Sequence, residues 1–207
     1  MALELAAGVT LYLTRHGQTQ ANLEKRFSGA KDTPLTALGL AQARQVGTVL
    51  ERALGMRPAI AFVASPYARA QATMRIVRET LELPPDGFTT DARLTEINLG
   101  AWDQLTDAEA RALDPAAFDA RSADKWNVHV PGGGENYQEA AARASDWVRG
   151  LTADTVAVTH GAIIRILRGL FLDLDWRGMN ALDETQGVVF RIRGRDVVRL
   201  EPEGKLG

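Results

Sequence analysis

The stretch Val9-Thr10-Leu11-Tyr12-Leu13-Thr14-Arg15-His16-Gly17 places an arginine and a histidine at the end of an apolar run. Apolar residues alternate with threonine and tyrosine along it, which predicts a strand, and Gly17 allows backbone to approach a ligand closely. Arg15 offers a planar fork of donors suited to phosphate, and a neutral His16 ring nitrogen can act as a nucleophile. An Arg-His pair alone is weak evidence, because a histidine at a strand end is more often structural.

The same order of strand, histidine and glycine occurs again late in the chain. The β-type run over residues 155–159 is followed by His160, Gly161 and a helix-like stretch over residues 162–170. Functional groups of α/β proteins gather where parallel strands end. The repetition therefore favours a site that His16 and His160 share.

Between these units, helix-like and strand-like segments alternate. Apolar spacing predicts helices over 38–54, 66–81 and 135–149, strands over 59–64 and 88–94, and a final hairpin of 188–192 and 197–200 around Gly194. Pro66 fits the first turn of its helix, where a missing N–H is no loss. Such alternation predicts an α/β fold, a three-layer α/β/α sandwich with a mostly parallel central sheet.

The region before the third of these helices is expected to form a small helical cap. Residues 106–121 are helix-like but contain Asp114-Pro115, which predicts two short helices. A length of 207 residues suits one substantial core. We therefore expect a single domain over residues 1–207, with the cap inserted at about 97–134.

Composition excludes several function classes. Hydrophobic content of 45% and charged content of 24% are ordinary for a folded domain, and a net charge of −2 gives no field for holding nucleic acid or an anionic membrane. The absence of cysteine excludes disulfides and thiolate metal sites. The first residues lack the features of a secretory signal, and charged residues interrupt the apolar stretch 157–174, so we expect a cytoplasmic protein without a membrane span.

Several motifs, taken together and in order, resemble those of the histidine phosphatase superfamily, also called the phosphoglycerate mutase-like family. The matching segments are Arg15-His16-Gly17 with Thr19 and Asn22, then 32–43, Ala64-Ser65-Pro66-Tyr67-Ala68-Arg69-Ala70, Leu94-Thr95-Glu96-Ile97-Asn98-Leu99-Gly100-Ala101-Trp102, and Val158-Thr159-His160-Gly161. They run from the first predicted strand to the helix after His160. The resemblance therefore covers most of the chain and implies the phosphatase branch.

The resemblance implies a role for each of six residues. His16 would be the nucleophile that becomes phosphohistidine, His160 a second histidine that hydrogen-bonds the transferring group, and Glu96 the proton donor and later the base. Phosphate would be bound by Arg15, Asn22 and Arg69. The sequence alone does not choose Glu96 over the nearby carboxylates of residues 91 and 103. No cofactor or metal is implied, and the partner would be a small phosphorylated metabolite.

Alternative functions remain open at this point. Mutases of the family share the phosphohistidine, but residues 97–100 lack the arginine, histidine and tyrosine cluster that mutases carry there, and the chain has no room for their longer insertion. A non-catalytic module binding phosphorylated ligands is a second alternative. A metal-dependent hydrolase is disfavoured because the histidines show no close ligand pair, and a serine hydrolase because no G-x-S-x-G occurs.

A few residues beyond the motifs concern the cap. Arg121 and Lys125 suggest a substrate with a second anionic group. With Trp102 and Trp126 they could contact a sugar, an amino acid or a nucleotide portion, and the sequence does not rank these. Gln104 stands where many relatives have glycine, which leaves the path of the cap loop open. We expect His129 to be a surface or cap residue, and the resemblance places the glycines of residues 132–134 near the rim of the pocket.

Overall fold

A six-stranded sheet forms the centre of the molecule in a computed structural model that describes residues 3–55 and 60–202. The strands are β1 (Thr10–Arg15), β2 (Ala61–Ala64), β3 (Thr89–Thr90), β4 (Thr155–Thr159), β5 (Val189–Arg193) and β6 (Asp196–Leu200). Their order is β3-β2-β4-β1-β5-β6, and only β5 and β6 run antiparallel to their neighbours. The predicted mostly parallel sheet and the final hairpin are confirmed.

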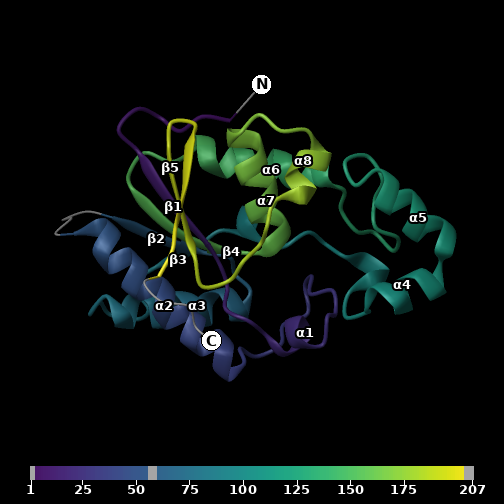
Figure 1. Cartoon of the computed structure of the whole chain (residues 1–207), viewed down its shortest axis with the longest axis horizontal. Coiled ribbons are helices and arrows are strands. Elements are labelled where there is room, and N and C mark those ends of the chain that lie inside the picture. The colour runs from purple at the N-terminus through teal and green to yellow at the C-terminus, as the bar shows by residue number, and fades with distance from the viewer. Residues whose placement is uncertain (1–2, 56–59, 203–207) are drawn as a thin grey trace.

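Helices cover both faces of this sheet (Figure 1). One layer holds α2 (Ala37–Leu54) and α3 (Ala68–Thr80), and the other α6 (Tyr137–Arg149), α7 (Gly161–Phe171) and α8 (Trp176–Ala181). Alternation along β1 produces the two cores: Leu11 and Leu13 pack toward α6 and α7, whereas Tyr12 packs toward α2 and α3. The predicted three-layer sandwich is confirmed.

The register of the central strands brings the two histidines together. Arg15 of β1 is paired with Thr159 of β4, so His16 and His160 follow at the same edge of the sheet. The backbone N–H of His16 continues the ladder by donating to Thr159 O at 3.0 Å. The two predicted units of strand and histidine therefore end at the same point on the edge of the sheet.

Short elements lie beyond this edge. They are α1 (Gln20–Leu23), η1 (Ala92–Leu94), η2 (Gly100–Trp102), α4 (Asp107–Leu113) and α5 (Pro115–Ala123). The last two lie away from the sheet (Figure 1), and the predicted break is present because Asp114 caps α5 and Pro115 is its first residue. An insertion at 97–134 within a single domain remains our proposal for how the chain is organised.

Some local predictions are wrong. The strand predicted over 88–94 is reduced to two residues, because the Asp91 carboxylate accepts the Arg93 N–H and starts a 3-10 turn. Pro66 precedes α3 instead of starting it, since Asp32 caps the helix by accepting the N–H of Ala68. The two helices α1 and α8 were not predicted, and Ala59 of the predicted second strand lies outside the described residues.

The turn after β1 fits against the start of α2 with no space for a side chain. A Cβ built on Gly39 would lie 2.0 Å from Gln18 O, and one built on Gly17 would lie 2.2 Å from Gly39 O. In both cases the added Cβ would meet a backbone oxygen, which cannot rotate away as a side chain can. The position of the loop that carries His16 depends on these glycines.

Gly39→Ala should lower the free energy of unfolding by about 1 to 3 kcal/mol, because the added methyl group overpacks a backbone contact. Urea denaturation measures the change. Gly150→Ala is the matched control, since the nearest atom to its Cβ is 3.4 Å away and the effect should stay within about 0.5 kcal/mol. Equal losses in the two variants would contradict the close-packing argument.

Candidate functional site

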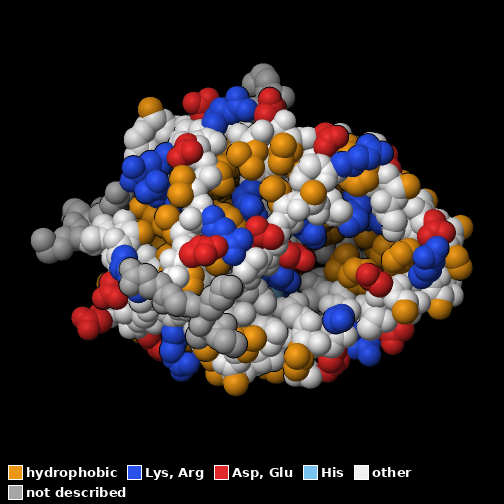
Figure 2. Space-filling model, viewed as in Figure 1, with side chains coloured by type: hydrophobic (Ala, Val, Ile, Leu, Met, Phe, Trp, Pro, Cys, Tyr) orange, Lys and Arg blue, Asp and Glu red, His pale blue; other side chains and the backbone are white. Residues whose placement is uncertain are grey.

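A cavity of about 300 Å³ opens at this edge of the sheet, between the sheet and the short helices α4 and α5. Figure 2 shows the surface hollowed there, with hydrophobic side chains toward α4 and α5 and charged ones around the hollow. Four of the six residues predicted for the site line it: Arg15, His16, Asn22 and Glu96. Arg69 and His160 lie behind His16 and are buried.

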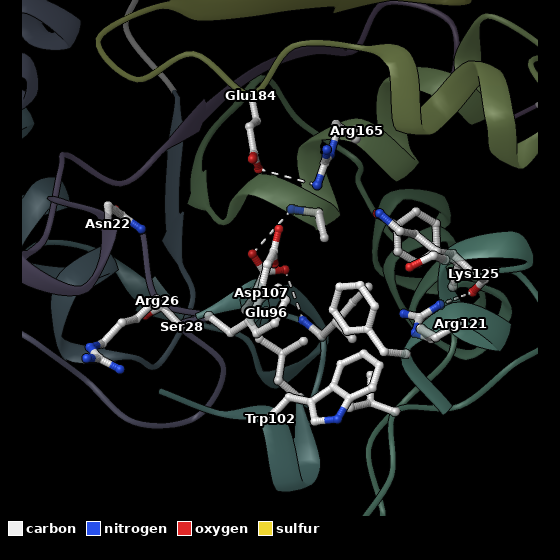
Figure 3. Close-up of a pocket in the computed structure, with 18 of the residues that line it drawn as sticks. Asn22, Arg26, Ser28, Glu96, Trp102, Asp107, Arg121, Lys125, Arg165 and Glu184 are labelled. Carbon is white, nitrogen blue, oxygen red and sulfur yellow. Dashed lines mark hydrogen bonds and ion pairs between the residues drawn. The ribbon is translucent and has the colours of Figure 1, made fainter. Parts of the chain in front are cut away.

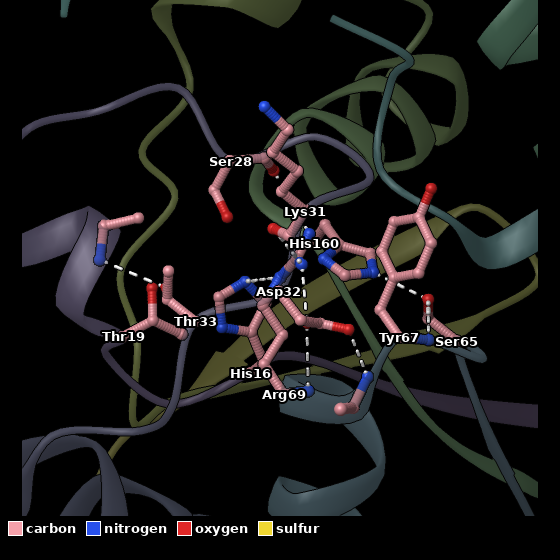
Figure 4. A network of polar contacts seen from close by, with 12 residues as sticks. His16, Thr19, Ser28, Lys31, Asp32, Thr33, Ser65, Tyr67, Arg69 and His160 are labelled. Atoms are coloured by element: carbon pink, nitrogen blue, oxygen red, sulfur yellow. Dashed lines mark hydrogen bonds and ion pairs between the residues drawn. The ribbon is translucent and has the colours of Figure 1, made fainter. Parts of the chain in front are cut away.

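His16 is held in one orientation by both of its ring nitrogens (Figure 4). Nδ1 lies 2.8 Å from Gly17 O, an acceptor, so this nitrogen carries the proton. Nε2 accepts a hydrogen bond from Arg69 Nε at 3.3 Å. Burial lowers the pKa of His16 well below its usual value, and the charges of Arg15 and Arg69 lower it further. The ring is therefore neutral, with its lone pair on Nε2.

His160 lies beside His16, with ring centroids 5.1 Å apart. Its Nε2 is 2.7 Å from the Ser65 hydroxyl, which itself accepts the N–H of Tyr67. Because Ser65 can donate its proton to Nε2, the neutral ring would carry its own proton on Nδ1. Burial, followed by the neighbouring His16 and Arg69, lowers the pKa of His160 well below its usual value. The structure thus brings together the two histidines that the sequence predicted.

Arg69 differs from the expectation for a phosphate-binding residue. Its side chain is fully buried, and the guanidinium binds Asp32 Oδ1 at 2.7 Å together with Ser28 O and Gly29 O (Figure 4). Its Nε donates to His16. All its nitrogens have protein partners, so in this arrangement Arg69 supports His16 and the 28–32 loop and does not line the cavity.

Arg15 and Asn22 keep donors free toward the cavity. Arg15 Nη1 donates to Glu184 O at 3.0 Å, whereas its Nε is buried and has no partner among the described residues. The Asn22 carbonyl oxygen accepts from Thr19 N–H and from Gln186 Nε2, which leaves its amide nitrogen for a ligand. Both side chains therefore line the cavity with donors available, and their binding of phosphate stays a prediction.

Glu96 lies partly buried in the cavity wall against the start of α7 (Figure 3). Its carboxylate oxygens accept the N–H groups of Ile97 at 2.9 Å and Ala162 at 3.2 Å. These bonds and Arg15 favour the charged form, but burial and the negative charge of Glu184 outweigh them and raise the pKa of Glu96. Of the three carboxylates that the sequence left open, only residue 96 lines the cavity; Asp91 pairs with Arg93, and Asp103 holds the backbone of the 29–31 loop.

The loop that precedes β5 was not predicted to take part in the site. Glu184 Oε2 lies 3.6 Å from both Arg15 Nη1 and Arg165 Nη2, and Gln186 donates to His16 O and to Asn22 Oδ1 at 3.0 Å each. A Cβ on Gly161 would meet Glu184 Oε2 at 1.8 Å, so this carboxylate lies directly on the start of α7. No local pattern distinguishes residues 184 and 186, because their partners lie far away in the sequence.

Several buried polar atoms around the cavity have no partner in the part of the chain that the structure describes. They are Arg15 Nε, Ser28 Oγ, Trp102 Nε1, His160 Nδ1 and Arg165 Nε. Buried donors and acceptors in native proteins are nearly always paired. Their concentration at one place indicates that the cavity binds a polar ligand.

The residues of the cap have mixed outcomes. His129 is about half exposed and lies 3.0 Å from Glu139, in agreement with a surface role. Gln104 takes a φ of 74°, a conformation that favours glycine, and both its backbone and its side chain donate to Phe27 O. The loop therefore keeps a glycine-like path with glutamine in place. The glycines of residues 132–134 pack on residues 98–101, beside the cavity wall.

Across residues 3–55 and 60–202 no group of three or more histidine or acidic side chains is arranged to hold a metal ion. No helix in these same ranges is both long and apolar enough to cross a membrane. The cytoplasmic location expected from the sequence stays a prediction.

Comparison with known proteins gives matches along nearly the whole chain. The model of the histidine phosphatase superfamily, branch 1, matches residues 11–199. The chain is 30% identical over 162 residues to the adenosylcobalamin/alpha-ribazole phosphatase of Salmonella typhimurium, covering 76% of each. It is 32% identical over 199 residues to a 2,3-bisphosphoglycerate-dependent phosphoglycerate mutase of Rhizobium etli, covering 86% of this chain and 87% of the relative. The solved structure of Bacillus stearothermophilus YhfR matches with a TM-score of 0.77 and 31% identity, covering 97% and 98%.

Arg15→Gln should raise the pKa of His16, because it removes one of the two positive charges that disfavour a protonated ring. A histidine NMR titration measures this, with His16→Ala to assign the signal. In the wild type the ring should still be neutral at about pH 6, where an ordinary imidazole is mostly protonated. Arg26→Gln, on the same cavity but outside the contacts of His16, is the control, and an equal change in both variants would contradict the assignment.

Proposed function

Because this chain belongs to branch 1 of the histidine phosphatase superfamily, we propose that it is a phosphomonoesterase that hydrolyses a small phosphorylated metabolite through a phosphohistidine at His16. The observation that carries the proposal is the state of His16. Its ring is neutral and donates Nδ1–H to Gly17 O, and the Nε2 lone pair, which accepts from Arg69 Nε at 3.3 Å, must leave that bond to attack phosphorus. The unpartnered Arg15 Nε and His160 Nδ1 supply donors beside it.

In the first step, His16 Nε2 forms a bond to phosphorus as the bond from phosphorus to the ester oxygen breaks. Arg15, Asn22 and His160 donate to the phosphoryl oxygens, whose negative charge they stabilise in the transition state. Glu96 gives its proton to the departing oxygen, so the alcohol leaves neutral. Its raised pKa supports this role, since the acid must hold a proton near neutral pH.

In the second step, water attacks the phosphohistidine. The Glu96 carboxylate accepts a proton from the water while the bond from His16 Nε2 to phosphorus breaks, which regenerates the neutral ring and releases inorganic phosphate. Gln186 and Gly17 hold the backbone and ring of His16 in both steps. Arg69 acts through His16 and the 28–32 loop, so we assign it a positioning role in place of the direct phosphate contact expected from the sequence.

Transfer to a second hydroxyl, as in a mutase, is the alternative, and a mutase is among the relatives. We favour hydrolysis because residues 97–100 fold into a short turn against residues 131–135, where Glu135 accepts the Asn98 N–H. The segment offers none of the basic side chains that the resemblance leads us to expect of a mutase. We also propose that no metal takes part, because arginines supply the positive charge that phosphoryl transfer needs.

The test is to quench a turnover mixture with alkali and search for phosphorylated His16 by mass spectrometry, with phenyl phosphate as substrate and with EDTA present. We expect the adduct in the wild type, and neither adduct nor release of phosphate in His16→Ala. His129→Ala is the matched control and should retain activity, because that ring is exposed and paired with Glu139. Full activity in His16→Ala would overturn the mechanism, and ligand binding without turnover in the wild type would indicate a non-catalytic module.

Glu184→Gln should move the alkaline limb of kcat/KM to lower pH. Glu96 must be protonated in the first step, and the negative charge of Glu184 contributes to the raised pKa of Glu96, so its removal lets Glu96 lose the proton earlier. A pH–rate profile with phenyl phosphate measures the shift. Asp183→Asn removes the neighbouring carboxylate, which pairs with Arg168 and Arg199, and should leave the limb in place.

A further inference from the structure

One side of the cavity carries positive charge that the reacting phosphoryl group does not use. Arg165, Lys125 and Arg121 line the cavity and lie on the side opposite Asn22 in Figure 3. Asn22 marks the His16 side, because Gln186 bonds both Asn22 Oδ1 and His16 O. These cations are therefore available to another part of a ligand.

Lys125 is the least compensated of the three. Its Nζ donates to Asn180 Oδ1 at 2.7 Å, and no carboxylate among the described residues forms an ion pair with it. Burial lowers the pKa of Lys125 to about 8, with Arg165 and Arg121 lowering it and Asp107 and Glu184 opposing them more weakly. A desolvated ammonium beside two guanidinium groups is a site that favours an anion.

Arg165 also has unused capacity. Its side chain is 19% exposed, its Nε is buried without a partner, and its Nη2 lies 3.6 Å from Glu184 Oε2. Glu184 is shared with Arg15 at the same distance, so one carboxylate serves two guanidinium groups. Glu184 therefore offsets only part of the positive charge of Arg165, whose repulsion lowers the pKa of Lys125.

Arg121, which the sequence suggested as the partner of Lys125, is partly engaged by the protein. It is buried, its Nη1 donates to Lys125 O, and its guanidinium lies 5.3 Å from the centre of the Tyr137 ring. It holds the backbone of Lys125 in place. Lys125 and Arg165, from α7, are the two cations with fewer contacts to the protein.

An apolar wall completes this part of the cavity. Trp102 stacks on Phe27, with centroids 6.1 Å apart, and lies tilted against Phe118, with centroids 5.5 Å apart. All three line the cavity, and Trp102 Nε1 has no partner in the described chain. The wall suits the organic body of a ligand that reaches from His16 to the cations.

We propose that the substrate carries a carboxylate on its leaving portion, which Lys125 and Arg165 bind while the phosphoryl group lies at His16. The inference rests on the proposed function. We favour a singly charged carboxylate over a second phosphate because Glu184 already balances part of the charge of Arg165. Lys125 and Arg165 are then specificity-determining residues and take no part in bond breaking.

The test compares phenyl phosphate with its 2-, 3- and 4-carboxyphenyl analogues, and with phenylene bisphosphates, by kcat/KM. We expect at least one carboxylated ester to exceed phenyl phosphate by about tenfold, the effect of one charge-assisted hydrogen bond. In Lys125→Gln and in Arg165→Gln this ratio should fall toward one. Arg26→Gln, which alters a cation on the other side of the same cavity, should leave the ratio unchanged.

The outcomes separate the two proposals. If the wild type hydrolyses phenyl phosphate but prefers no carboxylated ester, or if Lys125→Gln keeps the full preference, the carboxylate subsite is wrong and the phosphatase stands. A preference confined to the bisphosphates would overturn the assignment to a carboxylate. Failure to hydrolyse any of the esters would overturn the proposed function itself.

Discussion

The burial of a neutral imidazole between two guanidinium groups is the constraint on which the site depends. His16 is buried, and Arg15 and Arg69 make a positive charge on it unfavourable. Gly17 O then selects the tautomer by accepting Nδ1–H. Because β1 ends at Arg15 and its ladder with β4 continues through His16 N–H, the sheet itself fixes where this ring lies.

The surrounding residues can be understood as consequences of this arrangement. Two arginines near one ring require negative partners. Asp32 pairs with Arg69 and Glu184 with Arg15, and the two acids come from different parts of the chain. Asp32 also caps α3, so the helix that carries Arg69 begins where its counter-charge lies. Glu184 adds negative charge beside Glu96 and so contributes to the raised pKa of Glu96. Charge balance thus links the proposed acid, the proposed nucleophile and the fold.

Much of this was predictable from local sequence. Alternation in β1 and β4 and the histidine-glycine pairs after them identified the edge of the sheet and two of its residues, because strand periodicity and turn chemistry are local properties. The hydrogen-bond partners of Arg69 were not predictable, because they include the carbonyl oxygens of residues 28 and 29, which the fold brings onto its guanidinium. Glu184 and Gln186 were not predicted for the same reason. The residues of the site that they contact, near the first strand, are about 170 residues away in the sequence.

The loop of residues 183–186 joins the last part of the sheet to the turn after the first strand. On a ribosome, β1 and its histidine emerge long before Gln186 has been synthesised. Until β5 pairs with β1, the carbonyl of His16 and the amide of Asn22 lack the side chain that ties them together. A nascent chain therefore cannot assemble the pocket early, and its competence to handle phosphate esters should arrive late in translation.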